Sequence, residues 1–274
     1  MIKSKDLPHL INLLDDPSED IRQTILKELE SFGTNLEDEI YNLDIQLDPP
    51  RKDLLESLYE KNDRIWLKKV WPSVLEIEDE FKQLETGLSY LCDYQNGRYY
   101  SRKLPHMLDH LAEEYKLFYT TSDHFQLIHF LSHQKQLKGA DHDYYNPMNS
   151  NLVYVLEKGN GLPISLVSIL MLTGKRLGLP FEGCNFPGHF LARFFSHEED
   201  EMVLVDCYNN GNLIYSSDLA LLDQQAFKGL ISVAHEKTSS RSMLQRTIGN
   251  IANAYGKTKD KTNQELFEAL LLRS

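Results

Sequence analysis

Residues Gly159 to Gly178 read "GNGLPISLVSILMLTGKRLG", and this stretch decides the fold. Its middle is apolar nearly all round when it is wound as a helix, and such a helix is normally buried inside a domain. Pro163 suits the first turn of a helix, because the N–H that it lacks would have no partner there. Gly178 suits the position just after a helix ends. The stretch therefore predicts a buried central helix near residues 163–177.

The residues after this helix predict short strands separated by turns. "PFEGCNF" (180–186), "HFLARFF" (189–195) and "EMVLVDCY" (201–208) are rich in β-branched and aromatic residues, and "NNGNLIYS" (209–216) reads as a turn that leads into another strand. We expect an antiparallel sheet from about residue 181 to 216, followed by helices from about Ser240 to Ser274. A central helix that precedes antiparallel strands indicates the α+β class.

The residues before the central helix predict a helical region that ends in a polar loop. "ADHDYYNPMNSNL" (140–152) is rich in Asp, Asn and Pro, which are typical of loops. Helical patterns precede it, and two amphipathic stretches around Pro17–Ser18 resemble one HEAT-like helical hairpin. We place a domain boundary near residue 75. The expected parts are a helical N-terminal extension (1–75) and a second domain (76–274), made of a helical lead-in (76–140), a core (141–235) and C-terminal helices (240–274).

The composition limits the classes of partner. The chain has 274 residues, is 41% apolar and carries a net charge of -12. An acidic surface repels phosphate groups, so we expect neither nucleic-acid binding nor binding to anionic membranes. No apolar segment follows "MIKSKDLPHL", and no apolar run approaches a membrane span in length. The three cysteines, Cys92, Cys184 and Cys207, do not suggest a disulfide framework, which favours a cytoplasmic location.

The stretch "YYNPMNSNLVYVLEKGNGLPISLVSILMLTGKRLGLPFEGCNFPGHFLARF", followed by "VLVDCYNNG", resembles the SirB-type group of the transglutaminase-like superfamily. The resemblance is dense from Tyr144 to Gly211 and weaker from about Phe81 to Ile251. It implies a papain-like core with a buried central helix packed on an antiparallel sheet. In active members of the superfamily a cysteine begins the central helix, a histidine follows on one strand, and an aspartate follows on the next.

By this resemblance, His189 in "PGHF" takes the place of the histidine and Asp206 in "LVDCY" takes that of the aspartate. We expect the two side chains to share a hydrogen bond. The place of the cysteine falls at residues 163–165, where Pro163 and Ser165 stand and no cysteine is present. Ser165 is then a candidate nucleophile, although a serine in the first turn of a helix is more often a capping residue.

Two cysteines near the candidate site have to be weighed as nucleophiles. Five residues along a strand place Cys184 and His189 on opposite faces, unless the Pro-Gly turn between them breaks the alternation. Cys207 follows Asp206 directly, so it also points to the opposite face. We expect both thiols to point into the core, away from the start of the central helix, as small buried apolar residues.

The polar loop and the strand turns supply candidate residues that line the cleft. They are Tyr145, Asn146, Asn149, Pro163 and Asn185. The alternative is that the asparagines form a network of Asx turns with a purely structural role.

A metal site is the remaining chemical possibility. His129 and His133 are four residues apart, which places both on one face of a helix. No glutamate follows in the H-E-x-x-H manner, and zinc needs three or four converging ligands. We therefore expect no metal and no cofactor, and keep a metal-dependent activity around this pair as a third hypothesis.

The first functional hypothesis is a transglutaminase-like domain that lacks the nucleophilic cysteine and acts as a binding or regulatory module. Its expected partner is a protein or a peptide. The alternative is a hydrolase or acyltransferase on amide or ester bonds. It would use His189 as base, Asp206 to orient that base, and Ser165 or a cysteine as nucleophile.

Overall fold

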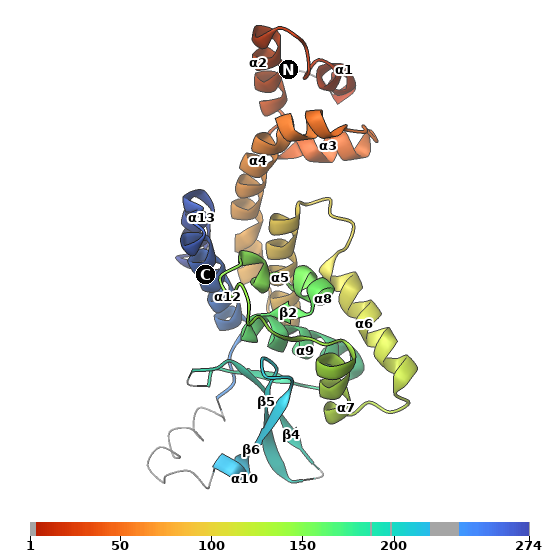
Figure 1. The fold of residues 1–274 in the computed structure, drawn as a ribbon, viewed down its shortest axis with the longest axis vertical. Coiled ribbons are helices and arrows are strands. Elements are labelled where there is room, and N and C mark those ends of the chain that lie inside the picture. The colour runs from red at the N-terminus through yellow and green to blue at the C-terminus, as the bar shows by residue number, and fades with distance from the viewer. Residues whose placement is uncertain (1–3, 187, 198, 220–235, 274) are drawn as a thin grey trace. The chain divides into compact units, whose positions relative to one another are not determined.

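The computed structural model describes residues 4–186, 188–197, 199–219 and 236–273 (Figure 1). Pro187 of the "PGHF" motif and residues 220–235, at the end of the predicted core, lie outside the described residues. The chain divides into two compact units. The first contains residues 1–70 and 97–99, and the second contains residues 71–96 and 100–274.

The first unit is helical and has a core of its own. In order it contains η1 (Ser4–Asp6), α1 (Leu7–Asn12), α2 (Glu19–Glu30), η2 (Gly33–Asn35), α3 (Leu36–Asn42) and the first part of α4 (Pro49–Leu75). The apolar spacing of α2 turns Ile25 and Leu29, four residues apart, to one side, where both are buried. Leucine and isoleucine side chains from α1, α2, α3 and α4 complete this core.

The second unit surrounds the helix that the sequence singles out. Helix α9 runs from Pro163 to Leu177, which confirms the predicted bounds, and Gly178 ends it in the left-handed conformation (φ 73°). The other helical segments described in this unit are α5 (Glu80–Asn96), α6 (Leu104–Phe118), α7 (His124–His129), the π-helical turn η3 (Phe130–Gln134), η4 (Pro147–Ser150), α8 (Leu152–Lys158), α10 (Ser216–Leu219), α12 (Ser240–Lys257) and α13 (Lys261–Leu271). In the described part of the chain, no helix has the length and apolar character needed to span a membrane.

Four consecutive strands form the predicted antiparallel sheet, so the α+β prediction is confirmed. The strands are β3 (Glu182–Cys184), β4 (Leu191–Ser196), β5 (Glu201–Asp206) and β6 (Asn212–Tyr215), and they lie in sequence order in the sheet. The register places Ala192 opposite Val205, and Val205 opposite Leu213. Helix α9 packs on β3 and β4. At the outer strand β3, the N–H of Thr238 donates to the Gly183 carbonyl at 2.9 Å.

One sheet was not predicted. The two-residue strands β1 (Lys138–Gly139) and β2 (Asn160–Gly161) pair in parallel, because two residues are too few to show an alternating pattern in the sequence. Gly139 allows a close approach here, since a Cβ atom at this position would lie 2.5 Å from the ring of Tyr208. The Tyr208 hydroxyl donates to the carbonyl of Ala140 at 3.1 Å, which joins this small sheet to the end of β5.

Candidate functional site

His189 lies in the hairpin loop between β3 and β4, not on a strand as predicted. Its N–H donates to the Phe186 carbonyl at 3.0 Å and closes a turn, and Gly188 has the left-handed φ of 79° that this turn requires. Strand β4 begins only at Leu191. Because His189 lies in this turn, the alternating side-chain directions of a strand do not set the direction of its imidazole. The His189 side chain is 51% exposed.

Asp206 is the last residue of β5, and its carboxylate is largely buried. One carboxylate oxygen accepts from the Asn209 N–H at 3.2 Å, and the other accepts from the Asn209 side-chain amide at 2.7 Å. Asn209 was not among the predicted site residues. The signal for it was present, because Asp206 is followed by the turn residues Asn209, Asn210 and Gly211, and an Asp side chain readily bonds backbone groups of such a turn.

His189 and Asp206 are brought together, but the expected hydrogen bond is not formed. The Nδ1 atom of His189 lies 3.9 Å from the Oδ2 atom of Asp206. This is too long for a hydrogen bond, and the carboxylate oxygens already accept from Asn209. The contact is that of an ion pair, which is present when the imidazole carries a proton.

Ser165, at the start of α9, holds the preceding loop. Its side chain is buried, and its hydroxyl donates to the Asn149 carbonyl at 3.0 Å. The N–H of Leu162, the residue before Pro163, donates to the same carbonyl at 3.1 Å. The buried Asn149 side chain in turn donates to the Asp143 carbonyl at 2.8 Å, so Asn149 holds the earlier part of the loop as well.

The described contacts place the candidate residues in two separate sets. Ser165 and Asn149 form the first set, and His189 and Asp206 form the second. Within the described part of the chain, no hydrogen bond or ion pair joins the first set to the second. The Ser165 hydroxyl thus points its proton to the loop.

The other residues predicted to line the cleft have structural partners. The Asn146 side chain caps η4 by accepting from the Met148 N–H at 2.9 Å. Tyr145 is 47% exposed, and the ammonium of Lys257 lies 5.5 Å from the centre of its ring. Asn146 is therefore a turn residue, whereas Tyr145 presents an aromatic surface.

Asn185 contacts Arg246, a residue that was not among the predicted site residues. Its side-chain oxygen accepts from the guanidinium of Arg246 on α12, and the same guanidinium lies 5.4 Å from the ring centre of Phe190. Arg246 thus contacts residues of the hairpin loop on both sides of His189. No local pattern could have identified it, because it follows the loop by more than fifty residues.

Burial is the main cause that raises the pKa values of all three thiols. Cys184 packs against Leu191 and Leu204, and burial raises the pKa of its thiol. Burial, with a smaller effect from the Asp206 carboxylate, raises the pKa of Cys207 to about 12. Burial also raises the pKa of Cys92 to about 12.

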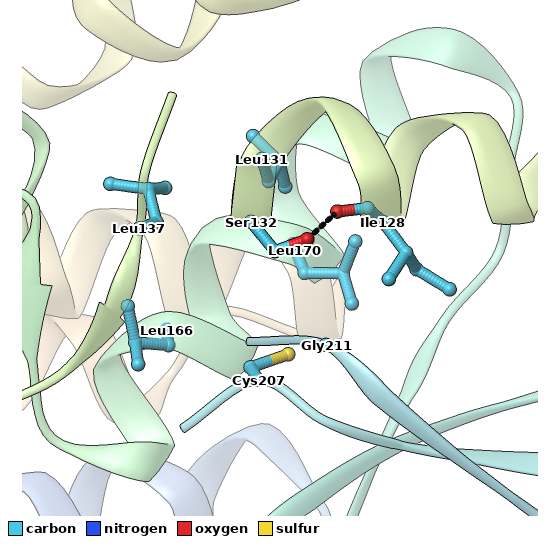
Figure 2. A pocket seen from close by; sticks show the side chains of 8 residues that line it. All are labelled: Ile128, Leu131, Ser132, Leu137, Leu166, Leu170, Cys207 and Gly211. Atoms are coloured by element: carbon cyan, nitrogen blue, oxygen red, sulfur yellow. Dashed lines mark hydrogen bonds between the residues drawn. The ribbon is translucent and has the colours of Figure 1, made fainter. Parts of the chain in front are cut away.

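The position of Cys207 differs in part from the prediction that its thiol points away from the start of the central helix. Its side chain lines a small cavity with a free volume of about 20 Å³, formed together with Ile128, Leu131, Ser132, Leu137, Leu166, Leu170 and Gly211 (Figure 2). Leu166 and Leu170 belong to the first half of α9. The thiol is thus turned inward as predicted, but it lies beside the beginning of the central helix rather than away from it.

His129 and His133, the candidate metal ligands, lie next to each other. In the described ranges, no group of three His, Cys, Asp or Glu side chains is placed to hold a metal ion. His129 and His133 do come together, with ring centroids 4.7 Å apart.

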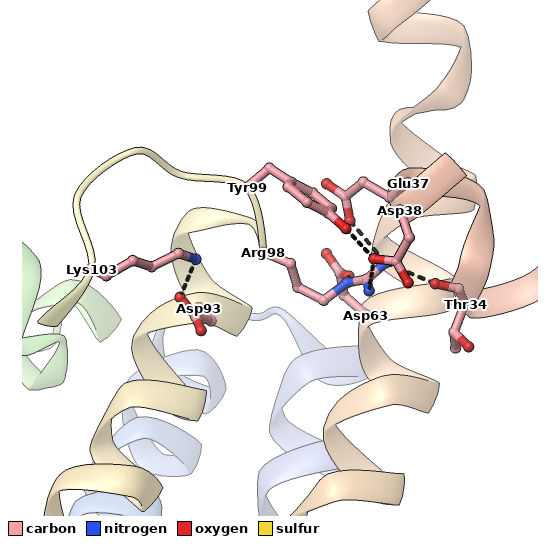
Figure 3. A network of polar contacts seen from close by, with 8 residues as sticks. All are labelled: Thr34, Glu37, Asp38, Asp63, Asp93, Arg98, Tyr99 and Lys103. Atoms are coloured by element: carbon pink, nitrogen blue, oxygen red, sulfur yellow. Dashed lines mark hydrogen bonds and ion pairs between the residues drawn. The ribbon is translucent and has the colours of Figure 1, made fainter. Parts of the chain in front are cut away.

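A second polar cluster lies in the N-terminal unit, centred on Arg98 (Figure 3). Its guanidinium contacts Asp63 at 2.8 Å, Glu37 at 3.0 Å and Asp38 at 3.1 Å. It also donates to the Thr34 carbonyl at 3.0 Å. One cation therefore faces three carboxylates that come from α3 and α4.

The charge balance of this cluster changes the acidity of its members. Burial, together with the negative charge of Asp63, raises the pKa of Glu37 to about 7, against the opposing effect of Arg98. Burial likewise raises the pKa of Asp63. A carboxyl group with a pKa near 7 takes up its proton close to neutral pH.

Comparison with known proteins gives a family match and several relatives. A family model described as the transglutaminase-like superfamily matches residues 99–249, just over half of the chain. A UPF0162 protein of Xylella fastidiosa is 32% identical over 136 residues, which are 46% of each chain. A UPF0162 protein of Pseudomonas aeruginosa is 33% identical over 108 residues, or 38% of each chain.

A mammalian protein is also similar to part of the chain. F-box only protein 21 of Mus musculus is 30% identical over 125 residues, which are 43% of this chain and 19% of that protein. The chain spans less than half of the length of these curated relatives. No solved structure matches the chain.

Proposed function

Because the chain belongs to the transglutaminase-like superfamily, we propose that its domain binds a protein or peptide partner and has lost the thiol chemistry of the active members. Binding would use the surface around His189, where the imidazole is half-exposed, and the exposed ring of Tyr145. The acidic net charge of -12 argues against nucleic acid as the partner.

The observation that carries this proposal is the hydrogen bond from Ser165 to Asn149. A nucleophilic hydroxyl must give its proton to a base, and the Ser165 hydroxyl gives it to a backbone carbonyl instead. Its side chain is also 1% exposed, so a substrate has no access to it. The residues beside it at the helix start, Pro163 and Ile164, offer no nucleophile.

The cysteines support the same conclusion. A thiol attacks as the thiolate, and the pKa values of Cys92 and Cys207 are raised to about 12 by burial. The pKa of Cys184 is raised for the same reason. None of these three thiols therefore replaces the missing cysteine in our proposal.

The relatives favour a domain that works as a part of larger proteins. The matched segment makes up 19% of the mouse relative, which is named F-box only protein 21. A domain found within a longer chain suits a role in binding. We extend the proposal to a SirB-type domain over residues 76–274, preceded by a helical extension over residues 1–75.

Two finer predictions stay open to test. The HEAT-like reading of the N-terminus is supported by the shared core of α1 and α2 and weakened by the length of α1, which has six residues. The cytoplasmic location rests on the three free cysteines, which suit a reducing compartment.

The hydrolase or acyltransferase is the alternative, and one observation favours it. His189 is accessible, and its imidazole lies 3.9 Å from the Asp206 carboxylate. This arrangement resembles a catalytic base that is oriented by a neighbouring carboxylate. A working enzyme would still need a nucleophile within hydrogen-bond reach of His189.

A probe experiment separates the two proposals. The native chain is treated with a fluorophosphonate and, in parallel, assayed for hydrolysis of p-nitrophenyl acetate. We expect no adduct on Ser165, and we expect the same slow ester hydrolysis for the wild type and for His189→Ala. An adduct on Ser165, or a rate that falls at least tenfold in His189→Ala, would establish the enzyme and refute the binding module.

A further inference from the structure

His129 and His133 stand side by side on the surface of the second unit. His129 is the last residue of α7, and His133 lies in the π-helical turn η3 that follows. Their ring centroids are 4.7 Å apart and their planes differ by 7°. Both residues are exposed, while Ile128, Phe130 and Leu131 between and beside them are buried. The helical turn that carries the pair is therefore anchored in the core.

The hydrogen bonds around His133 suit the tautomer that carries its proton on Nδ1. Its Nδ1 lies 2.8 Å from the Ser132 hydroxyl oxygen. That hydroxyl donates its single proton to the Ile128 carbonyl at 2.7 Å, as Figure 2 shows. With the hydroxyl proton on this bond, the Ser132 oxygen is free to accept from an Nδ1–H group of His133. The lone pair of the neutral imidazole is left on Nε2 of His133.

His129 has a comparable partner on its Nδ1 atom. The Tyr119 hydroxyl lies 3.4 Å from this nitrogen and also accepts from the Gln134 side-chain amide at 2.9 Å. A phenol oxygen can accept a second hydrogen bond, so an Nδ1–H of His129 also finds its acceptor here. Histidines that bind metal ions commonly donate the N–H of their other ring nitrogen to such a partner.

We propose that His129 and His133 bind one divalent transition-metal ion through their two Nε2 atoms. Neutral imidazole suits Ni²⁺, Cu²⁺ and Zn²⁺. The two rings are stacked, so they must turn toward each other before both Nε2 lone pairs point at one ion. Two protein ligands leave the other coordination positions to water. The ion is thus exchangeable at the surface, unlike a closed structural zinc site with four protein ligands.

The chain contains a matched control for this site. His106 and His110 on α6 have the same spacing and are also exposed. The side chain of His110 is 80% exposed, and its Nδ1 lies 4.0 Å from the Glu114 carboxylate, which is too far for a hydrogen bond. Within the described residues, no ring contact joins His106 to His110. Both pairs therefore share the same spacing, and among the described contacts His129 and His133 differ by the hydroxyl partners of their Nδ1 atoms.

The test is calorimetric titration of the untagged chain with Ni²⁺. We expect one ion per chain, a loss of at least about tenfold in affinity for His129→Ala/His133→Ala, and unchanged affinity for His106→Ala/His110→Ala. Ser132→Ala should weaken binding by about tenfold, because partners of ligating histidines typically contribute 10–100-fold in metal affinity.

A second readout locates the ion. Paramagnetic Ni²⁺ should broaden the imidazole NMR signals of His129 and His133 before those of the other histidines. Circular dichroism of each variant confirms that the fold is kept. The proposal is refuted if the wild type binds no Ni²⁺, if the His129/His133 variant retains its affinity, or if the His106/His110 variant loses as much.

Discussion

The Ser165 hydroxyl donates to the carbonyl of Asn149 across 3.0 Å, and so ties the start of α9 to the loop before it. The residue that stands where active superfamily members are expected to carry a cysteine thus makes a structural contact. Our proposal that the helix start holds a loop and presents no nucleophile rests on this bond.

Replacing Ser165 by alanine should lower the free energy of unfolding by about 1 kcal/mol, which is typical of one buried hydrogen bond. The Asn149 carbonyl keeps its bond from the Leu162 N–H, so it is not left without a donor. Ser168→Ala is the control, because Ser168 is equally buried but donates within its own helix to Ile164. Urea unfolding should show a smaller loss for Ser168→Ala. Equal losses would mean that the bond to the loop contributes nothing of its own.

The two members of the second set should differ in their effect on stability. Asp206→Ala should cost about 1–3 kcal/mol, because the Asn209 N–H and side-chain amide lose their acceptor. His189→Ala should change the free energy of unfolding by less than about 0.5 kcal/mol, as is usual for an exposed position without a hydrogen bond. The hydrogen bond that the sequence predicted between His189 and Asp206 would imply a larger loss for His189→Ala, but the two side chains are 3.9 Å apart. Thermal unfolding of both variants tests this difference. A large loss of unfolding free energy for His189→Ala would indicate a strong interaction between His189 and Asp206.

The native thiols should react slowly with iodoacetamide. At pH 7.5 the thiolate fraction is minute for a group such as Cys207, whose pKa is raised to about 12. Because the thiolate is the reactive form, labelling of Cys184 and Cys207 should still increase as the pH rises above 8. Mass spectrometry of the native and the urea-unfolded chain gives the two rates. Fast native labelling of either cysteine that disappears in His189→Ala would show an activated thiol.

The acidity of Glu37 predicts how the N-terminal unit responds to pH. Its pKa is about 7 in the folded chain, above the ordinary value of 4.5. The folded state then binds more protons than the unfolded state between these values, so the free energy of unfolding should fall as the pH rises from about 4.5 to 7. The contribution of this group reaches at most about 3 kcal/mol. Asp63, whose pKa is also raised, acts in the same direction.

Glu37→Gln isolates this effect from the other titrating groups. Arg98 keeps its contacts with Asp63 and Asp38, so the cluster retains two of its three carboxylates. The charges that act on Glu37 are those of Asp63, Arg98 and Asp38. Urea unfolding followed by tryptophan fluorescence at pH 5 and pH 7.5 should show a smaller pH dependence for Glu37→Gln than for the wild type. Identical pH dependence would show that Glu37 does not titrate in this range.

The sequence was most informative where one local pattern decides the structure. Helix α9 has the predicted bounds because an apolar run, a proline in the first turn and a left-handed glycine after the last turn all agree. The antiparallel strands followed from β-branched and aromatic residues between turns. These features depend on neighbours in the chain, which the sequence displays directly.

The candidate site was less predictable because its contacts join distant residues. Arg246 reaches the hairpin loop from α12, and the Ser165 hydroxyl meets a carbonyl sixteen residues earlier. His189 was placed on a strand because the apolar residues after it extend the pattern, whereas the turn at Gly188 delays β4 until Leu191. The residue types in the sequence suggested which side chains belong to the candidate site. Their hydrogen-bond partners could be identified only from the tertiary structure.

The bridge from Thr238 to Gly183 also affects how the chain behaves in a crowded solution. Strand β3 is the outer strand at its end of the sheet, and an outer strand offers unpaired backbone groups to other molecules. The Gly183 carbonyl is already occupied by a donor from the same chain. A second molecule that extends the sheet here must first displace Thr238, so this one bond opposes aggregation through the edge that β3 forms.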